Sequence, residues 1–375
     1  MTATSFVPFA DLSIQWREIR ERALPDLERL FEASAFCLGP WVTEFETRIA
    51  SLLGARHAVA VSSGSAALHL AVLAAGIGPG DRVLVPAHSF IGTLWGVIYA
   101  GATPVFCDVE PDTGTIDIAD AERRIGAGAK AIIPVHLYGQ PADMAAVRRF
   151  AQRRGLIVIE DVAQAIGASY EGKALGTHGA FGCFSFYPGK NLGGAGEGGL
   201  VITDDDGAAA SLKMLREHGQ AERYVHAHVG FNYRMDGIQG LILNHKLDHL
   251  ARWTDERRAI AARYDSAFRE LPLRLPRARH GDHVFHLYVV RTERRDALRT
   301  ALDAAGIQTG LHYPVPLHRQ PCLKQWATGQ DAFPVAEDFA GMGLSLPIFA
   351  GMSSGQQDRV ITAVRHFFGS QDPLR

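Results

Sequence analysis

The segment with the most informative chemistry surrounds Lys190, within the Gly-rich run from Cys183 to Gly199. Two phosphate-binding motifs fail to explain it. A P-loop has four residues between its first glycine and the Gly-Lys pair, whereas six residues separate Gly182 from Gly189, and asparagine follows the lysine. The stretch 194–199 matches GxGxxG, but it precedes a predicted strand instead of following one and opening a helix. The lysine therefore needs a different interpretation.

Lys190 lies on a Gly/Pro-rich loop just after an apolar segment. A lysine amine in a partly desolvated pocket can lose its proton and form a Schiff base with an aldehyde, and the alternative is a solvated surface lysine. Asp161 favours the chemical interpretation because it ends the apolar run that starts at Ile157. Ligands of open parallel sheets bind at the carboxyl ends of the strands.

These residues match the needs of pyridoxal phosphate, which requires a lysine, a carboxylate for its pyridinium nitrogen and donors for its phosphate. The run from Ser63 to Ser65 is a strand-to-helix turn whose free amides suit a phosphate. Phe90 ends the next strand, where an aromatic ring could stack on the cofactor. In the alternative interpretation, Ser65 only caps a helix and Phe90 packs in the core.

Between residues 55 and 205, short β-branched runs alternate with helical patterns. This alternation predicts an α/β domain built around a mostly parallel sheet. The predicted helices cover residues 65–75, 91–100 and 142–153. Strands are predicted at 57–61, 82–86, 103–108, 131–135, 156–160, 182–186 and 199–203.

A long, charged helical pattern over residues 236–268 separates this region from the rest of the chain. A strand at 283–291 and helices at 294–305 and 355–368 follow, which predicts a smaller α+β domain. We place the domain boundary in the long helix. The large domain, with the N-terminal segment, then covers residues 1–245, and the small domain covers residues 246–375.

Composition excludes several classes of protein. The 375 residues carry 38 Lys and Arg against 40 Asp and Glu, a net charge of −2, so no basic field supports nucleic-acid binding. The four cysteines form no CxxC pair, and we expect no metal site and a reducing cytoplasm. The first six residues lack signal-peptide features, and the longest apolar stretch, near 66–78, is too short to span a bilayer. We therefore expect no membrane partner.

A series of motifs follows in order along the chain. They are Ser63-Gly-Ser-Ala-Ala-Leu, Pro86-Ala-His-Ser-Phe-Ile, Ala100-Gly-Ala-Thr-Pro-Val-Phe-Cys-Asp-Val, His136-Leu-Tyr-Gly-Gln-Pro-Ala-Asp-Met, Glu160-Asp-Val-Ala-Gln-Ala, Phe184-Ser-Phe-Tyr-Pro-Gly-Lys-Asn, Gly230-Phe-Asn-Tyr-Arg-Met-Asp, His312-Tyr-Pro-Val-Pro-Leu-His and Leu344-Ser-Leu-Pro-Ile-Phe. With these motifs the chain resembles the pyridoxal-phosphate-dependent nucleotide-sugar aminotransferases of the DegT/StrS type along nearly its whole length.

The resemblance implies a fold-type I transferase: a large domain with a mostly parallel seven-stranded sheet, a smaller C-terminal α+β domain, and a homodimer with active sites shared between subunits. By the same resemblance, Lys190 binds the cofactor covalently, Asp161 pairs with the pyridine nitrogen and Gln164 lies near the ring and its hydroxyl. Gly189 departs from the Thr or Ser that often precedes the family's lysine. The remaining implied cofactor contacts are Gly64, Ser65 and Ser185 to the phosphate, Phe90 to the ring, and Asn232 to the phosphate from the partner subunit.

The resemblance also implies a ping-pong transamination in which L-glutamate leaves its amine on the cofactor and a nucleotide-linked keto-sugar collects it. Lys190 would move the proton as a general base and then acid. His312, Tyr313 and His318 would line the sugar pocket, with Arg234 near the diphosphate, although Pro314 and Pro316 could instead make this a rigid loop with solvated histidines.

The motif that begins at His312 resembles relatives that aminate the third carbon more than those that act on the fourth, so we expect a 3-keto acceptor. Two alternatives remain open. One is a sugar dehydratase, although that branch replaces the lysine with histidine and Lys190 is retained here. The other is a cofactor-binding sensor without turnover.

Overall fold

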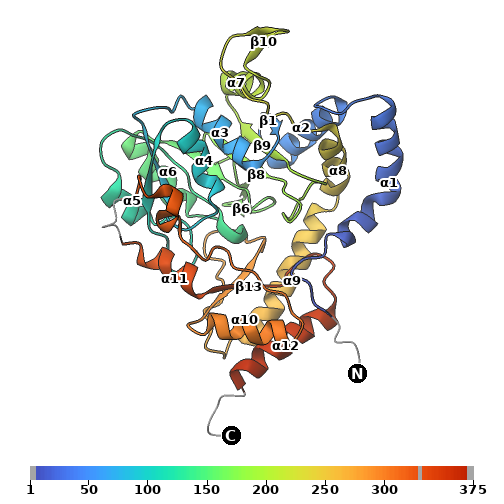
Figure 1. Cartoon of the computed structure of the whole chain (residues 1–375), viewed down its shortest axis with the longest axis vertical. Helices are drawn as coiled ribbons and strands as arrows, with labels where there is room; N and C mark the ends of the chain where they lie inside the picture. The colour runs from blue at the N-terminus through green and yellow to red at the C-terminus, as the bar shows by residue number, and fades with distance from the viewer. Residues whose placement is uncertain (1–5, 328–331, 370–375) are drawn as a thin grey trace.

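The computed structural model describes residues 6–327 and 332–369. Figure 1 shows a wide body that contains the central sheet and, below it, a narrower part formed by the C-terminal helices. The first five residues, on which much of the signal-peptide prediction rests, lie outside the described residues. In the part of the chain that is described, no helix is long and apolar enough to cross a membrane.

The central sheet has seven strands in the order β1-β9-β8-β5-β4-β2-β3. Only β9 runs antiparallel to its neighbours, so the predicted mostly parallel seven-stranded sheet is confirmed. The prediction for residues 131–135 was shifted, because that strand ends at Ile132. The strands are β1 (His57–Val61), β2 (Arg82–Pro86), β3 (Thr103–Cys107), β4 (Ala129–Ile132), β5 (Ile157–Asp161), β8 (Phe181–Ser185) and β9 (Gly199–Thr203).

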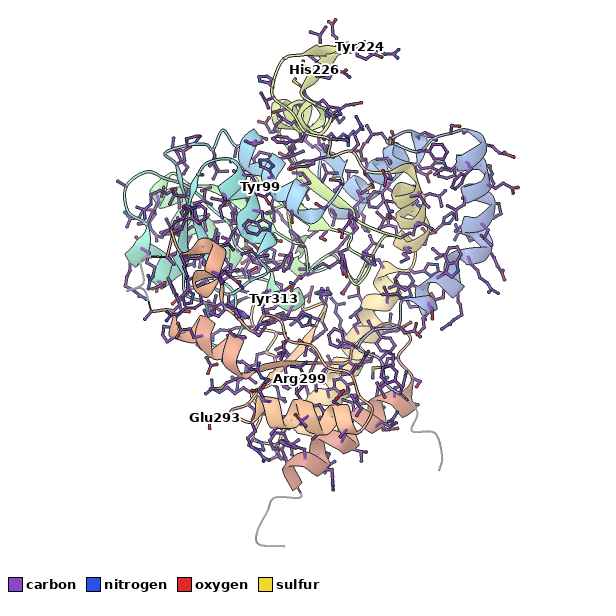
Figure 2. The ribbon with its side chains drawn as sticks, viewed as in Figure 1. Tyr99, Tyr224, His226, Glu293, Arg299 and Tyr313 are labelled. Carbon is purple, nitrogen blue, oxygen red and sulfur yellow. The ribbon has the colours of Figure 1, made fainter. Side chains whose placement is uncertain are left out.

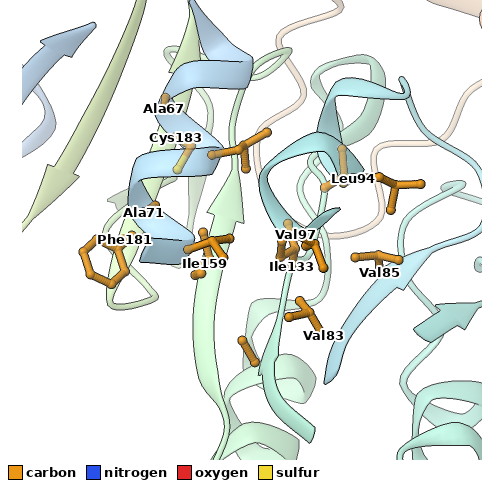
Figure 3. Packing of buried hydrophobic residues seen from close by; sticks show 14 of the residues in the cluster. Ala67, Ala71, Val83, Val85, Leu94, Val97, Ile133, Ile159, Phe181 and Cys183 are labelled. Carbon is orange, nitrogen blue, oxygen red and sulfur yellow. The ribbon is translucent and has the colours of Figure 1, made fainter. Parts of the chain in front are cut away.

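Alternate residues of each strand enter two separate hydrophobic clusters, one on each face of the sheet. On one face, α3 and α4 pack over the strands with small residues such as Ala67 and Ala71, as Figure 3 shows. The sheet is therefore buried on both faces, as a parallel sheet requires. The helices of this region are α3 (Gly64–Ala74), α4 (Gly92–Tyr99), α5 (Ile118–Arg124), α6 (Met144–Arg154) and α7 (Asp206–Arg216).

The N-terminal helices α1 (Ser13–Glu32) and α2 (Pro40–Leu53), which we did not predict, pack against α8 (Gly237–Leu247). The single helix predicted over 236–268 was wrong. The chain turns at Asp248 and His249 and continues as α9 (Leu250–Phe268). No proline or glycine marks this turn in the sequence. The break arises because α8 packs on large-domain helices, whereas α9 packs on α12 (Ser354–Gly369).

In the C-terminal part, α9 and α12 pack with α10 (Arg295–Ala304) and the antiparallel pair β12 (Tyr288–Arg291) and β13 (Gly343–Leu346). The strand predicted at 283–291 was too long. Before Tyr288 the chain pairs with the large domain instead, since the Val284 and Leu287 amides donate to the carbonyls of Gly139 and Tyr138.

The segment around Leu317 returns to the large domain, where its amide donates to the Ala87 carbonyl and its side chain joins the sheet cluster. Small elements complete the described fold. They are β6 (Ser169–Tyr170), β7 (Lys173–Ala174), β10 (Gln220–Glu222), β11 (Val225–His226), α11 (Pro334–Met342), and the 3-10 turns η1 (Leu137–Gly139), η2 (Leu317–Arg319) and η3 (Pro321–Leu323).

Candidate active site

Asp161 and Lys190 lie at the same edge of the central sheet. Asp161 is the last residue of β5, and β5 pairs in parallel with β8. The chain leaves β8 after Ser185, and a turn in which the Lys190 amide donates to the Tyr187 carbonyl at 2.9 Å follows. The carboxyl ends of two neighbouring parallel strands therefore carry the two predicted catalytic groups to one place.

The Asp161 carboxylate is buried and held by two hydrogen bonds. Thr93 Oγ1 donates to Oδ2 at 2.8 Å, and the Ala163 amide donates to Oδ1 at 3.1 Å. The pKa of Asp161 is raised, because the effect of burial exceeds the opposite effects of both hydrogen bonds and of the charge of Lys190. Each carboxylate oxygen keeps a free lone pair. The carboxylate can therefore accept a further N–H donor.

The Lys190 amine has a lowered pKa. Burial lowers it from 10.5 to about 8, although the nearby Asp161 and Glu197 carboxylates raise it in part. At pH 7 roughly a tenth of such amines are neutral, against well under a hundredth for an ordinary lysine. The neutral amine is the state that a nucleophile needs. The residue is also half-buried, which argues against the interpretation of Lys190 as a solvated surface residue.

The predicted phosphate site lies where two backbone segments, the start of α3 and the end of β8, approach closely. Ser63, not Ser65, caps α3, because its side chain accepts the Ala66 amide at 3.1 Å. In the described part of the chain, the Ser65 hydroxyl has no hydrogen-bond partner. A Cβ on Gly64 would lie 2.7 Å from the Ser185 Cβ, so this glycine allows β8 and α3 to meet. The free first-turn amides and two serine hydroxyls form a donor set that suits a phosphate.

Gln164 is buried in a hydrogen-bond network. Its Oε1 accepts the Tyr138 amide at 2.7 Å, and its Nε2 donates to the Tyr313 hydroxyl at 3.0 Å. Phe90 keeps 51% of its surface exposed, so it is not a core residue, and its ring lies 5.6 Å from that of Tyr313. Tyr313 lies where the large body meets the C-terminal part of the chain (Figure 2).

The two histidines of the predicted sugar pocket differ. His312 is half-buried, hydrogen-bonds Ser345 Oγ at 2.8 Å and stacks on Phe9. Burial, and to a smaller extent the charge of Lys190, lower its pKa to about 4. His318 instead is buried against Phe333 and bonded to Glu337 at 3.1 Å. These contacts explain why the structure buries His318, and its role as a sugar contact stays a prediction.

Asn232 lies on a segment that borders the end of β1. The neighbouring Tyr233 carbonyl accepts the Ser62 amide at 2.8 Å, and Arg234 forms a bridge with Val61. The Asn232 side chain is exposed. Figure 2 shows the preceding β10–β11 hairpin, marked by Tyr224 and His226, as a projection from the body. An exposed side chain after a projecting hairpin is accessible to a second subunit.

The residues present fit pyridoxal phosphate. The glycine-lined phosphate turn, a buried carboxylate with free lone pairs and a lysine of lowered pKa supply the three required groups. Among the described residues, no group of His, Cys, Asp and Glu could hold a metal ion. Sequence reasoning missed Thr93, whose only signal is its place one turn after Phe90, and Tyr138, whose role no pattern indicated.

Comparison with the sequences of known proteins identifies the same family that the motifs resemble. The model of the DegT/DnrJ/EryC1/StrS aminotransferase family matches residues 17–365. The dTDP-3-amino-3,4,6-trideoxy-alpha-D-glucose transaminase of Streptomyces venezuelae is 44% identical over 366 residues, which cover 97% of each chain. The pleiotropic regulatory protein of Geobacillus stearothermophilus is 42% identical over 366 residues, which cover 96% of this chain and 98% of that protein.

Solved structures agree with this result. S. venezuelae DesV superposes with a TM-score of 0.94 at 45% identity, covering 96% of this chain and 98% of DesV. NtdA from Bacillus subtilis, with its bound cofactor PMP, superposes with a TM-score of 0.91 at 31% identity, covering 97% of this chain and 86% of NtdA. The chain therefore belongs to the DegT/DnrJ/EryC1/StrS aminotransferase family, which confirms the predicted fold-type I architecture, the pyridoxal phosphate cofactor and the aminotransferase activity.

Proposed function

We propose that the protein transfers an amino group from L-glutamate to a nucleotide-linked 3-keto sugar. The observation that carries this proposal is the placement of Lys190, with its lowered pKa, beside the buried Asp161 at the carboxyl edge of the sheet. The similarity to a transaminase named for a 3-amino sugar supports the choice of acceptor.

When bound, pyridoxal phosphate supplies an aldehyde that takes up the amine and a ring that accepts electrons. Asp161 would hold the proton on the ring nitrogen, while Thr93 fixes the carboxylate through Oδ2. Lys190 Nζ would take the proton from the α-carbon of the amino donor and later return a proton. Gly64, Ser65 and Ser185 would donate hydrogen bonds to the phosphate.

His312 and Tyr313 would line the acceptor pocket. Their rings pack beside Phe9 and Phe90, and their polar atoms can contact sugar hydroxyls. Burial raises the pKa of Tyr313, so its phenol stays protonated, and the low pKa of His312 keeps that imidazole neutral. A wall of neutral donors and acceptors suits a hydroxylated ring better than a charged ligand.

One experiment separates the candidate functions. The holoenzyme is mixed with L-glutamate, and the release of 2-oxoglutarate is followed together with the loss of the cofactor's absorption band. Matched 3-keto and 4-keto nucleotide sugars are then supplied, and NMR locates the new amine. Product from the 4-keto compound alone would refute the acceptor proposed here while leaving transamination intact.

A regulatory role is the second candidate, because a relative of 42% identity carries the name pleiotropic regulatory protein. A sensor would bind the cofactor without turnover. Absence of 2-oxoglutarate after addition of L-glutamate to cofactor-loaded protein would favour that role. A dehydratase is disfavoured because Lys190 is retained.

A further inference from the structure

Tyr138 makes four hydrogen bonds that join loops at the edge of the central sheet to segments of the C-terminal part of the chain. Its amide donates to Gln164 Oε1 at 2.7 Å, and its carbonyl accepts the Leu287 amide at 3.2 Å. Its hydroxyl donates to the His312 carbonyl and also bonds His88 Nε2, the latter at 2.7 Å. Two of these partners belong to loops at the sheet edge, and two belong to the segments that follow α9.

The backbone of Tyr138 adopts a conformation that a bulky residue rarely takes. Its φ of 60° lies in the left-handed region, and only 5% of the residue is exposed. Such a conformation persists where surrounding contacts determine it, and it clusters at functional sites. Here it directs the amide toward Gln164 while the side chain reaches His312.

The hydrogen positions in this network follow from its chemistry. A carbonyl oxygen only accepts, so the Tyr138 hydroxyl donates its one hydrogen bond to the His312 carbonyl. His88 Nε2 must then donate to the phenol oxygen. His88 is fully buried, and burial together with the charge of Arg291 lowers its pKa to about 3. A neutral His88 with its proton on Nε2 therefore orients the Tyr138 hydroxyl, and its Nδ1 has no partner among the described residues.

We propose that Tyr138 is a positioning residue for the acceptor side of the reaction, which holds the His312–Tyr313 segment against Gln164, with His88 as the support of its hydroxyl. This inference rests on the proposed function. Gln164 Oε1 accepts a hydrogen bond from the Tyr138 amide, and Gln164 Nε2 donates one to the Tyr313 hydroxyl. Tyr138 therefore aligns His312 directly and Tyr313 through Gln164. The cofactor contacts Asp161 and Lys190 receive no hydrogen bond from Tyr138.

The test compares Tyr138→Phe with Tyr264→Phe. Tyr264 is also a buried phenol that donates to a backbone carbonyl, that of Pro347 at 3.0 Å, but it lies within the core of the C-terminal part. Tyr138→Phe keeps the amide bond to Gln164 and removes only the hydroxyl. We expect the KM for the keto-sugar to rise about tenfold while the glutamate half-reaction stays within about twofold of wild type. Tyr264→Phe should leave both unchanged.

Hydrogen exchange of residues 308–313 in protein without substrate provides a second readout. Exchange should accelerate about tenfold in Tyr138→Phe and not in Tyr264→Phe. Unchanged exchange and KM, or equal losses in both half-reactions, would overturn the proposal. If Tyr138→Phe does not fold, His88→Asn should give the same pattern at about threefold, and no change there would also overturn it.

The two proposals fail in different ways. If wild-type protein releases no 2-oxoglutarate, the proposed transfer from L-glutamate is wrong, and the exchange measurement still decides whether Tyr138 holds the His312–Tyr313 segment. If transamination proceeds but Tyr138→Phe behaves like Tyr264→Phe, only the positioning role is wrong.

Discussion

The cofactor side and the acceptor side of this site are built in different ways. Asp161 ends a strand of the central sheet, Ser65 and Lys190 follow shortly after strands of the same sheet, and all three are placed by local strand-and-turn geometry. The acceptor side depends on contacts between residues far apart in the chain, such as Tyr138 with His312, which are 174 positions apart. The cofactor side can therefore work as part of a single sheet edge, whereas the acceptor side exists only when two parts of the chain are packed together.

The largest effect should come from Lys190→Ala, which removes the only group proposed to bind the cofactor covalently. Turnover and borohydride trapping of the cofactor should both be lost. Lys246 is a matched control, because burial also lowers its pKa to about 8. Its amine, however, donates hydrogen bonds to Gln15 Oε1 and to the Gly193 carbonyl. Lys246→Met should retain trapping, and trapping on a Lys190→Ala protein would contradict the assignment of the lysine.

Asp161→Asn should retain cofactor but lose at least about 100-fold in activity, because the amide cannot hold the proton on the ring nitrogen. Steady-state rates and the cofactor content of purified protein provide the measurement. Near-normal activity would remove Asp161 from the mechanism. Both half-reactions should slow together, in contrast to the selective effect expected for Tyr138→Phe.

Exchange of subunits tests whether the site includes a partner residue. In equal mixtures of Lys190→Ala and Asn232→Ala proteins, half of the dimers are mixed and each has one intact site if Asn232 acts across the interface, so about a quarter of wild-type activity should return. Activity is measured after exchange has been verified by mass spectrometry. No recovery despite proven exchange would show that Asn232 serves its own subunit.

The smallest effect should follow Thr93→Val. The Thr93 hydrogen bond favours the ionised form of Asp161, so its removal raises the pKa of that carboxyl. The acid limb of kcat/KM against pH should move to higher pH, with a loss of about fivefold at neutral pH. Ser89→Ala is the control, because Ser89 bonds Thr93 but not the carboxylate, and it should leave the acid limb in place.

Sequence patterns predicted the strands of the central sheet with small errors, because each is a short apolar run bounded by turn residues. They failed where packing decided the outcome. The break between α8 and α9 has no local signal, and the chain before Tyr288 pairs with the loop at Tyr138 instead of extending β12. The sequence also gave no sign that His318 bonds Glu337, a contact that depends on how the segment around Leu317 packs.

The motifs and their order were enough to predict the fold class and the cofactor, and the sequence also predicted Lys190 and Asp161 as the catalytic pair. Such a pair can be predicted because strand ends in a parallel sheet meet at one edge whatever the rest of the chain does. Only the tertiary structure showed that Thr93 holds the Asp161 carboxylate and that Ser63, not Ser65, caps α3. It alone revealed Tyr138, since hydrogen bonds between residues more than 100 positions apart depend on how the two parts of the chain pack, and no local spacing encodes that packing.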